Sequence, residues 1–366
     1  MAKSSGGATK AVGGKVDCIA LYDLPHCNSL IQFNSSQRIC SRWSACNFTL
    51  IFIKHLLSVL IYLRQSITAV IIKDYKRNLL RVNMKFVVFI LSISLSFFGH
   101  AIVIRHDVTD EKYLAKQIDF PPLATFYIDG AHGTLIKPNW VLTAAHATFC
   151  VQTGSFIRLA GKTRKVSNVY VNPDYTPGKS HDIALIQLQD DVTDVSPAAV
   201  YTKSDELGKN IWFIGIGGTG TGLKGQTIDN AENKGMLRRA QNTIVAAQGP
   251  LIKFKFDQGE NALPLEGVSG CGDSGGPAYI RNDYGYQLLG ISSRPEGNFE
   301  NIGEYGITEV YTRVSYFSAW INLVIEASPE DREKISLPKL TYLPAGVTED
   351  ILPMVCNDIG IKSDEN

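Results

Sequence analysis

The run Gly272-Asp273-Ser274-Gly275-Gly276-Pro277 is the segment of this sequence best suited to chemistry. A serine flanked by glycines can sit on a tight turn as a nucleophile, because glycine adopts backbone conformations that other residues avoid. Such a turn lets the backbone amides of Gly272 and Ser274 point at one oxygen and form an oxyanion hole. Average residue usage makes a chance copy of this run rarer than about 1 in 10⁴ in a chain of 366 residues. A glycine-rich turn between two strands is the structural alternative.

A serine hydroxyl is a poor nucleophile until a neighbouring base accepts its proton. Residues 102–366 contain four histidines: His106, His132, His146 and His181. His146 ends the run Leu142-Thr143-Ala144-Ala145-His146, whose small residues leave room for the imidazole beside a neighbouring element. Asp182 opens an apolar run over residues 182–188, where a buried carboxylate needs a partner. We therefore expect His146 as base and Asp182 as the acid that orients it, with a core histidine and a strand-edge aspartate as the structural alternatives.

The order of these residues along the chain discriminates between folds. The pattern Gly272-x-Ser274-x-Gly276 also fits the nucleophile elbow of α/β-hydrolases, but their histidine follows the serine, and every histidine here precedes Ser274. A subtilisin-like order needs an acid before His146, and the β-rich pattern disfavours that fold. The order His146, Asp182, Ser274 remains.

Two further patterns indicate other chemistries more weakly. Gly215-Ile216-Gly217-Gly218-Thr219-Gly220 fits the dinucleotide pattern G-x-G-x-x-G, but that site needs a helix directly afterwards, and a loop-like segment follows here. His132, His146 and His181 are candidate metal ligands, but no pair of histidines has H-x-x-x-H spacing and no cysteines have C-x-x-C spacing. The sequence therefore predicts no cofactor and no metal.

The charges are divided unevenly along the chain. Residues 1–83 carry 11 Lys and Arg against 3 Asp and Glu, whereas residues 102–366 carry 24 basic and 32 acidic side chains. The acidic part argues against nucleic acid as a partner, since binding phosphates requires stripes of Lys and Arg.

A secretory signal peptide is predicted inside the chain, over residues 84–101. Met84-Lys85 is a short positive start, residues 86–98 are an unbroken apolar run, and Gly99-His100-Ala101 places small residues at the −3 and −1 positions of a cleavage site. Residues 1–83 have no sustained period and are expected to be an upstream extension without a folded domain. A membrane anchor is the alternative, because residues 86–104 contain no Lys, Arg, Asp or Glu and are long enough to span a bilayer.

From residue 125 onward, short runs rich in Val, Ile, Tyr, Phe and Thr alternate with Gly, Pro, Asn and Asp clusters, which is typical of an all-β fold. The predicted strands are 125–128, 140–144, 156–159, 166–171, 183–188, 211–216, 243–246, 251–256, 278–280 and 286–291. Residues 282–285 predict a hairpin turn. Only residues 314–327 have helical spacing, and Ser328-Pro329-Glu330 predicts a break and a new helix cap. Two β units joined near residues 190–207 are the natural division.

At these residues the chain resembles the trypsin/chymotrypsin-like serine endopeptidases, as a bacterial-type member. The resemblance covers about residues 102–327, and the landmark segments 140–146, 182–185, 267–277 and 310–314 follow the family order. It implies two antiparallel six-stranded Greek-key β-barrels, over about residues 102–195 and 208–313, with a C-terminal helix and the active site between the barrels. Residues 328–366 are expected to form a polar tail.

The resemblance also implies a role for each site residue. His146 would take the proton from Ser274 Oγ as it attacks a peptide carbonyl, and Asp182 would orient the imidazole. Ser293 matches the position that supports the acid and the substrate backbone.

Activation is expected to depend on Asp273, which matches the acid that pairs with a newly formed N-terminal amine. Ile102-Val103 directly follows the predicted cleavage site at Ala101. We therefore expect signal peptidase itself to create the amine of Ile102.

Specificity is predicted from the residues that match the substrate pocket. Val268 stands six residues before Ser274, where trypsins carry an aspartate. An apolar base predicts preference for an apolar or aromatic substrate side chain. Glu309 can approach the same pocket and reverse that preference, and Pro295 replaces a glycine whose N–H pairs with substrate in the family.

The cysteines depart from the family pattern. Ala147 and Ala131 occupy the places of the disulfide that usually flanks the catalytic histidine. Cys271 lies one residue closer to Ser274 than the usual cysteine. The body therefore either lacks the family's disulfides or joins Cys150 to Cys356.

The sequence as a whole predicts a monomeric serine endopeptidase that acts on proteins or peptides. It would be secreted or periplasmic and meet the membrane only through its signal peptide, or else be anchored with the protease domain outside. The alternative functions are an inactive protease homologue that acts as a binding protein, and an esterase or transferase using the same three residues.

Overall fold

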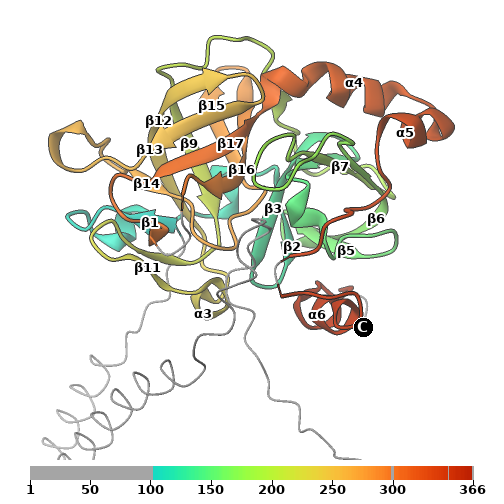
Figure 1. Cartoon of the computed structure of the whole chain (residues 1–366), viewed down its shortest axis with the longest axis horizontal. Coiled ribbons are helices and arrows are strands. Elements are labelled where there is room, and N and C mark those ends of the chain that lie inside the picture. The colour runs from blue at the N-terminus through green and yellow to red at the C-terminus, as the bar shows by residue number, and fades with distance from the viewer. Residues whose placement is uncertain (1–101, 298–300, 345, 365–366) are drawn as a thin grey trace, which may run out of the picture. The chain divides into compact units, whose positions relative to one another are not determined.

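The computed structural model describes residues 102–297, 301–344 and 346–364. The predicted upstream extension and signal peptide lie outside these residues. Within the described part, strands predominate and form two closed barrels and one small sheet (Figure 1). The prediction of an all-β fold with two six-stranded antiparallel barrels is confirmed.

Six antiparallel strands close the first barrel in the order β2-β3-β4-β7-β6-β5. These strands are β2 (Leu123–Tyr127), β3 (Gly130–Lys137), β4 (Trp140–Thr143), β5 (Phe156–Leu159), β6 (Lys162–Val171) and β7 (Ala184–Leu188). The core of this barrel contains the fully buried Leu135, Leu142 and Ile157. Burial of such apolar side chains is the main force that closes the barrel.

The second barrel closes in the order β15-β9-β12-β13-β17-β16, with β16 pairing back to β15. These strands are β9 (Asn210–Gly215), β12 (Arg238–Gln248), β13 (Leu251–Lys255), β15 (Pro277–Asn282), β16 (Gly285–Pro295) and β17 (Thr308–Arg313). Asn282 pairs with Gly285, which confirms the predicted hairpin turn. Strand β8 (Ala199–Val200), from the segment between the barrels, adds to β16 in parallel.

A four-stranded sheet lies beside the barrels, in the order β11-β10-β1-β14. These strands are β11 (Gly225–Ile228), β10 (Thr219–Thr221), β1 (Ile102–Ile104) and β14 (Gly267–Val268). Strand β1 runs parallel to β10 and antiparallel to β14, and Ile102 and Val103 are fully buried. The first barrel therefore begins at Leu123 rather than at Ile102.

The described helices are short, and all but one of them follow the second barrel in sequence. They are α3 (Asn230–Asn233), α4 (Ser318–Glu326), α5 (Pro329–Ile335) and α6 (Leu352–Ile359), with 3-10 turns at Asp110–Lys112, Gln117–Asp119, His146–Thr148, Gly259–Asn261 and Val314–Phe317. Helix α4 confirms the predicted C-terminal helix, and its buried Ile321 and Val324 join the core of the first barrel. Among the described helices, none has the length and apolar character needed to cross a bilayer.

The segment after α4 packs on the first barrel. Ser328 Oγ accepts a hydrogen bond from the Asp331 N–H, as its predicted capping role requires. Arg332 of α5 lies over the Trp140 ring, 5.0 Å from its centroid. Leu337 pairs with Val171 of β6.

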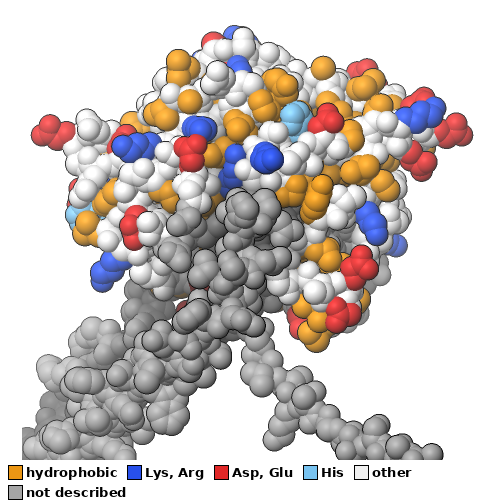
Figure 2. All heavy atoms as spheres, in the orientation of Figure 1, with side chains coloured by type: hydrophobic (Ala, Val, Ile, Leu, Met, Phe, Trp, Pro, Cys, Tyr) orange, Lys and Arg blue, Asp and Glu red, His pale blue; other side chains and the backbone are white. Residues whose placement is uncertain are grey.

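Figure 2 shows acidic and basic side chains interspersed on one face of the molecule.

A disulfide joins Cys356 of α6 to Cys150, which follows the His146–Thr148 turn. This settles the alternatives that the sequence left open for Cys150 and Cys356. Cys271 is not a free thiol.

We expect Cys356→Ser to lower the free energy of unfolding by about 2–5 kcal/mol, because a long cross-linked loop restricts the unfolded chain. The bond spans 206 residues of sequence. Denaturant unfolding of an inactive Ser274→Ala background measures the loss without self-digestion. Cys150→Ser should cost the same amount, and the double variant should cost no more than either one. Additive losses would contradict the assignment of the stability to this bond.

Candidate active site

His146 and Asp182 form a hydrogen-bonded pair at the ends of two neighbouring strands. His146 follows β4 and Asp182 precedes β7, and the pairing of Thr143 with Ala184 sets the two strands side by side. His146 Nδ1 lies 2.7 Å from Asp182 Oδ2, and the His146 backbone N–H donates to Asp182 Oδ1 at 3.0 Å. A proton on Nδ1 satisfies the carboxylate and leaves Nε2 with a lone pair that can accept another proton.

Asp182 is also held by residues of the second barrel. Ser293 Oγ donates to Asp182 Oδ2 at 2.6 Å, and Thr312 Oγ1 donates to the Asp182 backbone carbonyl at 2.8 Å. Burial alone would raise the pKa of Asp182, but the charge of His146 and the hydrogen bonds from His146 and Ser293 outweigh it and lower that pKa. Asp182 therefore stays ionised at neutral pH.

Ser274 lies on the loop between β14 and β15, and this loop is hydrogen-bonded to both barrels. From β3 of the first barrel, the His132 N–H donates to the Ser274 carbonyl at 2.7 Å. Toward β16 of the second barrel, the Gly275 N–H donates to the Ser292 carbonyl at 2.9 Å, and the Ser292 N–H donates to the Gly276 carbonyl at 2.8 Å. Ser274 is thus fixed where the two barrels meet.

The backbone before the serine requires glycine. Gly272 has a φ of +93°, which strains any residue with a Cβ, and its carbonyl accepts the Ala131 N–H at 2.7 Å. Within the described residues, neither the Gly272 N–H nor the Ser274 N–H donates to a protein acceptor. Both amides are free to donate to a substrate oxygen.

Packing of the serine loop against β4 requires glycine at position 275. A Cβ on Gly275 would collide with Thr143 Oγ1, three residues before His146, so only glycine allows this close approach of the loop to β4. Among the described residues no hydrogen bond joins Ser274 Oγ to the His146 ring. Such bonds often form only when substrate binds.

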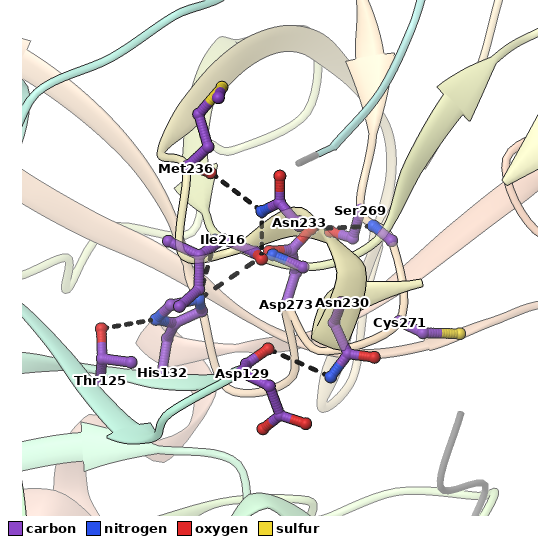
Figure 3. Close-up of polar contacts among 12 residues, drawn as sticks. Thr125, Asp129, His132, Ile216, Asn230, Asn233, Met236, Ser269, Cys271 and Asp273 are labelled. Atoms are coloured by element: carbon purple, nitrogen blue, oxygen red, sulfur yellow. Dashed lines mark hydrogen bonds and ion pairs between the residues drawn. The ribbon is translucent and has the colours of Figure 1, made fainter. Parts of the chain in front are cut away.

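Asp273, beside the serine, is buried with 3% of its surface exposed. Its Oδ1 accepts the Gly217 N–H at 2.7 Å and its Oδ2 accepts the Gly270 N–H at 2.9 Å. His132 Nε2 accepts the Ile216 N–H at 3.2 Å and lies 3.9 Å from Asp273 Oδ1 (Figure 3). Burial raises the pKa of Asp273 to about 7 and lowers the pKa of His132 to about 4. His132 is therefore neutral at pH 7 and gives Asp273 no compensating charge.

The approach of His132 to Asp273 is a contact that the sequence does not predict. The glycine pattern of residues 215–220 carries a signal for it, because a Cβ on Gly215 or Gly217 would collide with the Asp273 carboxyl. These glycines make room for a buried aspartate. Strand β10, not a helix, follows them, so the pattern is not a dinucleotide site.

The three histidines considered as metal ligands have separate partners. His132 lies beside Asp273, His146 beside Asp182, and the His181 ring beside Ser180 Oγ at 2.9 Å. Across residues 102–297, 301–344 and 346–364, no three His, Cys, Asp or Glu side chains are grouped to hold a metal ion.

Ile102 lies in the sheet that adjoins Asp273. Its partner Thr219 follows two residues after Gly217, which donates to Asp273, and Thr219 Oγ1 donates to the Ile102 carbonyl at 2.6 Å. In this chain Ala101 precedes Ile102, so the Ile102 nitrogen is part of a peptide bond and carries no charge. The ion pair between Ile102 and Asp273 stays a prediction for a chain cut after Ala101.

The decisive comparison is with protein-family models. The Trypsin family model matches residues 111–321, more than half of the chain. The chain belongs to the trypsin family. This trypsin-family chain is accordingly a serine-type endopeptidase, a hydrolase whose substrates are proteins or peptides.

Individual relatives of this trypsin-family chain come from different organisms. It is similar to "Trypsin" from Saccharopolyspora erythraea, 30% identical over 200 residues that cover 50% of this chain and 82% of the relative. "Serine protease SP24D" from Anopheles gambiae is 32% identical over 206 residues, covering 52% of this chain and 69% of the relative. "Serine protease SSP1" from Scolopendra subspinipes is 28% identical over 232 residues, covering 54% and 76%. The assignment to a bacterial type stays a prediction.

The three predicted substrate-binding residues of this trypsin-family chain lie in different surroundings. Ser293 contacts Asp182, as described above. Val268 is fully buried in β14 and packs with Val103 and Phe256. Glu309 of β17 is buried with 2% exposure.

The stability of the trypsin-family fold is expected to fall as pH rises from 6.5 to 8. Asp273, with its pKa raised from 3.8 to about 7, and Glu309, with its pKa raised from 4.5 to about 8, are both neutral in the fold at pH values where they ionise in the unfolded chain. Each therefore stabilises the fold at low pH and loses that contribution as pH rises through its folded pKa. His132, with its pKa lowered from 6.5 to about 4, has the opposite effect, but only below pH 6.5.

Thermal unfolding of the Ser274→Ala chain that is not cut after Ala101 measures the effect across this pH range. Glu309→Gln should flatten the dependence. An unfolding midpoint that rises with pH would contradict the expectation.

Proposed function

We propose that this trypsin-family chain hydrolyses peptide bonds through an acyl-enzyme on Ser274, with His146 as base and acid and Asp182 as the residue that orients it. The observation that best supports the proposal is the 2.7 Å contact between His146 Nδ1 and Asp182 Oδ2. Ser293 Oγ donates to the same Asp182 oxygen at 2.6 Å. This arrangement leaves His146 Nε2 able to take the Ser274 proton.

The reaction then follows from the positions of the polar groups. Ser274 Oγ attacks the peptide carbonyl while its proton passes to His146 Nε2, and the negative oxygen is received by the amides of Gly272 and Ser274. His146 then gives the proton to the leaving amine. A water molecule then attacks the acyl-enzyme while His146 takes its proton. His146 returns that proton to Ser274 Oγ as the carboxylic acid product is released.

We further propose that the protease acts outside the cytoplasm, secreted or periplasmic, as a monomer. The support is the signal-peptide pattern of residues 84–101, which lies outside the described residues. Cleavage after Ala101 would free the amine of Ile102 for Asp273. The position of β1 between β10 and β14, in the sheet that adjoins Asp273, supports this proposal.

Labelling of the exported protein with a serine-directed phosphonate tests the proposal. We expect an intact mass that starts at Ile102 and gains one adduct, and no adduct in Ser274→Ala. Hydrolysis of casein should disappear with the adduct. A chain that folds but takes no phosphonate and cleaves no casein would overturn the proposed function.

A further inference from the structure

The turn that carries His146 is held by the side chain of Tyr127, the last residue of β2. The Tyr127 hydroxyl donates to the Ala147 carbonyl at 2.7 Å and accepts the Cys150 backbone N–H at 3.1 Å. Tyr127 is buried, and burial raises the pKa of its hydroxyl, so the hydroxyl keeps the proton that it donates. One side chain thus joins the backbone directly after His146 to the backbone at the end of the turn.

The residue after His146 lacks the covalent attachment that is usual in the family. Ala147 and Ala131 occupy the places of the disulfide that flanks the catalytic histidine, and alanine cannot form that bond. Tyr127 lies in the same hairpin as Ala131, since it pairs with Gly130. Its hydroxyl therefore supplies a noncovalent attachment of Ala147 to this hairpin.

Tyr127 is itself held by the C-terminal segment, residues 359–361. Gly360 of this segment forms an antiparallel bridge with Tyr127, and Ile361 forms another with Phe156 of β5 (Figure 1). Strands β2 and β5 also pair with each other, at two residue pairs nearer the start of β2. The C-terminal segment therefore pairs with both strands beyond their own contact.

A covalent bond joins this segment to the histidine turn. Cys356 is bonded to Cys150, and the Cys356 carbonyl accepts the Gly360 N–H at 3.0 Å. A cavity of about 330 Å³, which both cysteines and Tyr127 help to line, lies between α6 and the first barrel. Because this space leaves α6 incompletely packed, attachment of the C-terminal segment depends on the disulfide and the backbone bridges.

The position of the turn sets the geometry of the proposed base. The backbone N–H of His146 and its ring Nδ1 both contact Asp182, at 3.0 and 2.7 Å. A shift of the turn moves both contacts together and displaces His146 Nε2 relative to Ser274. A misplacement of about 1 Å in a catalytic group can lower a rate by about 10²-fold.

We propose that Tyr127 is a positioning residue for His146, and that the C-terminal segment and its bond to Cys150 hold Tyr127 in this role. Tyr127 acts through the backbone of the histidine turn and touches no reacting atom. The inference rests on the proposed function of Ser274. It gives a catalytic purpose to a segment that follows residues 111–321, the part that the Trypsin family model matches.

Tyr127→Phe in the full chain tests the proposal, because it removes the hydroxyl and keeps the ring. We expect kcat for a peptide substrate to fall by about 10–10²-fold with KM nearly unchanged. Labelling by the serine-directed phosphonate should slow by a similar factor but still reach one adduct per chain. Tyr113→Phe is the matched control, since its buried hydroxyl donates to the Glu266 carbonyl at 2.9 Å in the second barrel. That variant should keep the kcat of the wild type.

A second variant tests the role of the C-terminal segment. Cys356→Ser releases the segment from the histidine turn and should also lower kcat. The double variant with Tyr127→Phe should be no slower than Tyr127→Phe alone, because both changes act on the same turn.

The outcomes separate this inference from the proposed function. A folded Tyr127→Phe enzyme with the kcat of the wild type overturns the positioning role and leaves the proposed function standing. An equal loss in Tyr113→Phe also overturns it, since the loss would then report stability alone. A wild type that takes no phosphonate and cleaves no peptide overturns both. If Tyr127→Phe does not fold, Cys356→Ser decides: a folded chain with the kcat of the wild type contradicts the proposal.

Discussion

Replacing Ser274 by Ala is expected to lower kcat by about 10⁵–10⁶-fold, the scale seen when a nucleophile that acts as a unit with its base is removed. Without Oγ, the proton acceptor His146 Nε2 has nothing to activate, and no acyl-enzyme forms. The amides of Gly272 and Ser274 remain in the variant and account for the residual rate. The measurement is hydrolysis of a peptide substrate at saturating concentration.

The decisive control is non-additivity. His146→Ala alone should cost about as much as Ser274→Ala, and the double variant should be no slower than either one, because each change disables the same step. Ser204→Ala, an exposed serine of the segment between the barrels, should retain full activity. Losses that multiply in the double variant would show that the two residues act independently, contrary to the mechanism.

The elements that position the site could be predicted because their signals are local. Alternating apolar runs and turn residues mark the strands within a few residues, as at 156–159, which matches β5 (Phe156–Leu159). The run from Gly272 to Pro277 marks a tight turn by its own composition. The contact between His146 and Asp182 is present as expected, since the two residues flank paired strands of one barrel.

The contacts that escaped prediction join segments distant in sequence. Nothing in the residues around His132 indicates Asp273, because the contact arises only when β3 and the serine loop are folded together. The bond between Cys150 and Cys356 stayed one of two alternatives, since cysteine spacing alone does not fix pairing. The sequence of the tail, residues 328–366, predicts only a polar segment. Its buried apolar side chains, such as Val355, are too far apart in sequence to form a periodic pattern.

The buried carboxyl of Asp273 is the reason why a free amine at Ile102 is expected to affect activity. Asp273 lies between Gly272 and Ser274, the two residues whose amides are proposed to receive the substrate oxygen. In the uncut chain its carboxyl is buried, its pKa is raised to about 7 by that burial, and the neighbouring His132 is neutral. A free amine at Ile102 would supply the missing positive charge and hold the loop in one arrangement.

A chain that begins at Ile102 should therefore be about 10²–10³-fold more active than one that carries a single extra alanine before it. A one-sided loss of a buried ion pair costs roughly 3–5 kcal/mol, and the extra residue removes the pair by turning the amine into a peptide nitrogen. Both chains can be made by removing a fusion partner that leaves the chosen first residue. The readout is kcat/KM on one peptide substrate, with phosphonate titration to count active sites.

Asp273→Asn provides the matched control, because the amide has no charge for the Ile102 amine to meet. In that background the extra alanine should change activity little, whereas in the wild type it should change activity strongly. Equal turnover of the two wild-type chains would show that the amine of Ile102 does not activate the enzyme. An equally large effect of the alanine in Asp273→Asn would instead mean that the extension acts by disturbing β1 between β10 and β14, and the ion pair would lose its role.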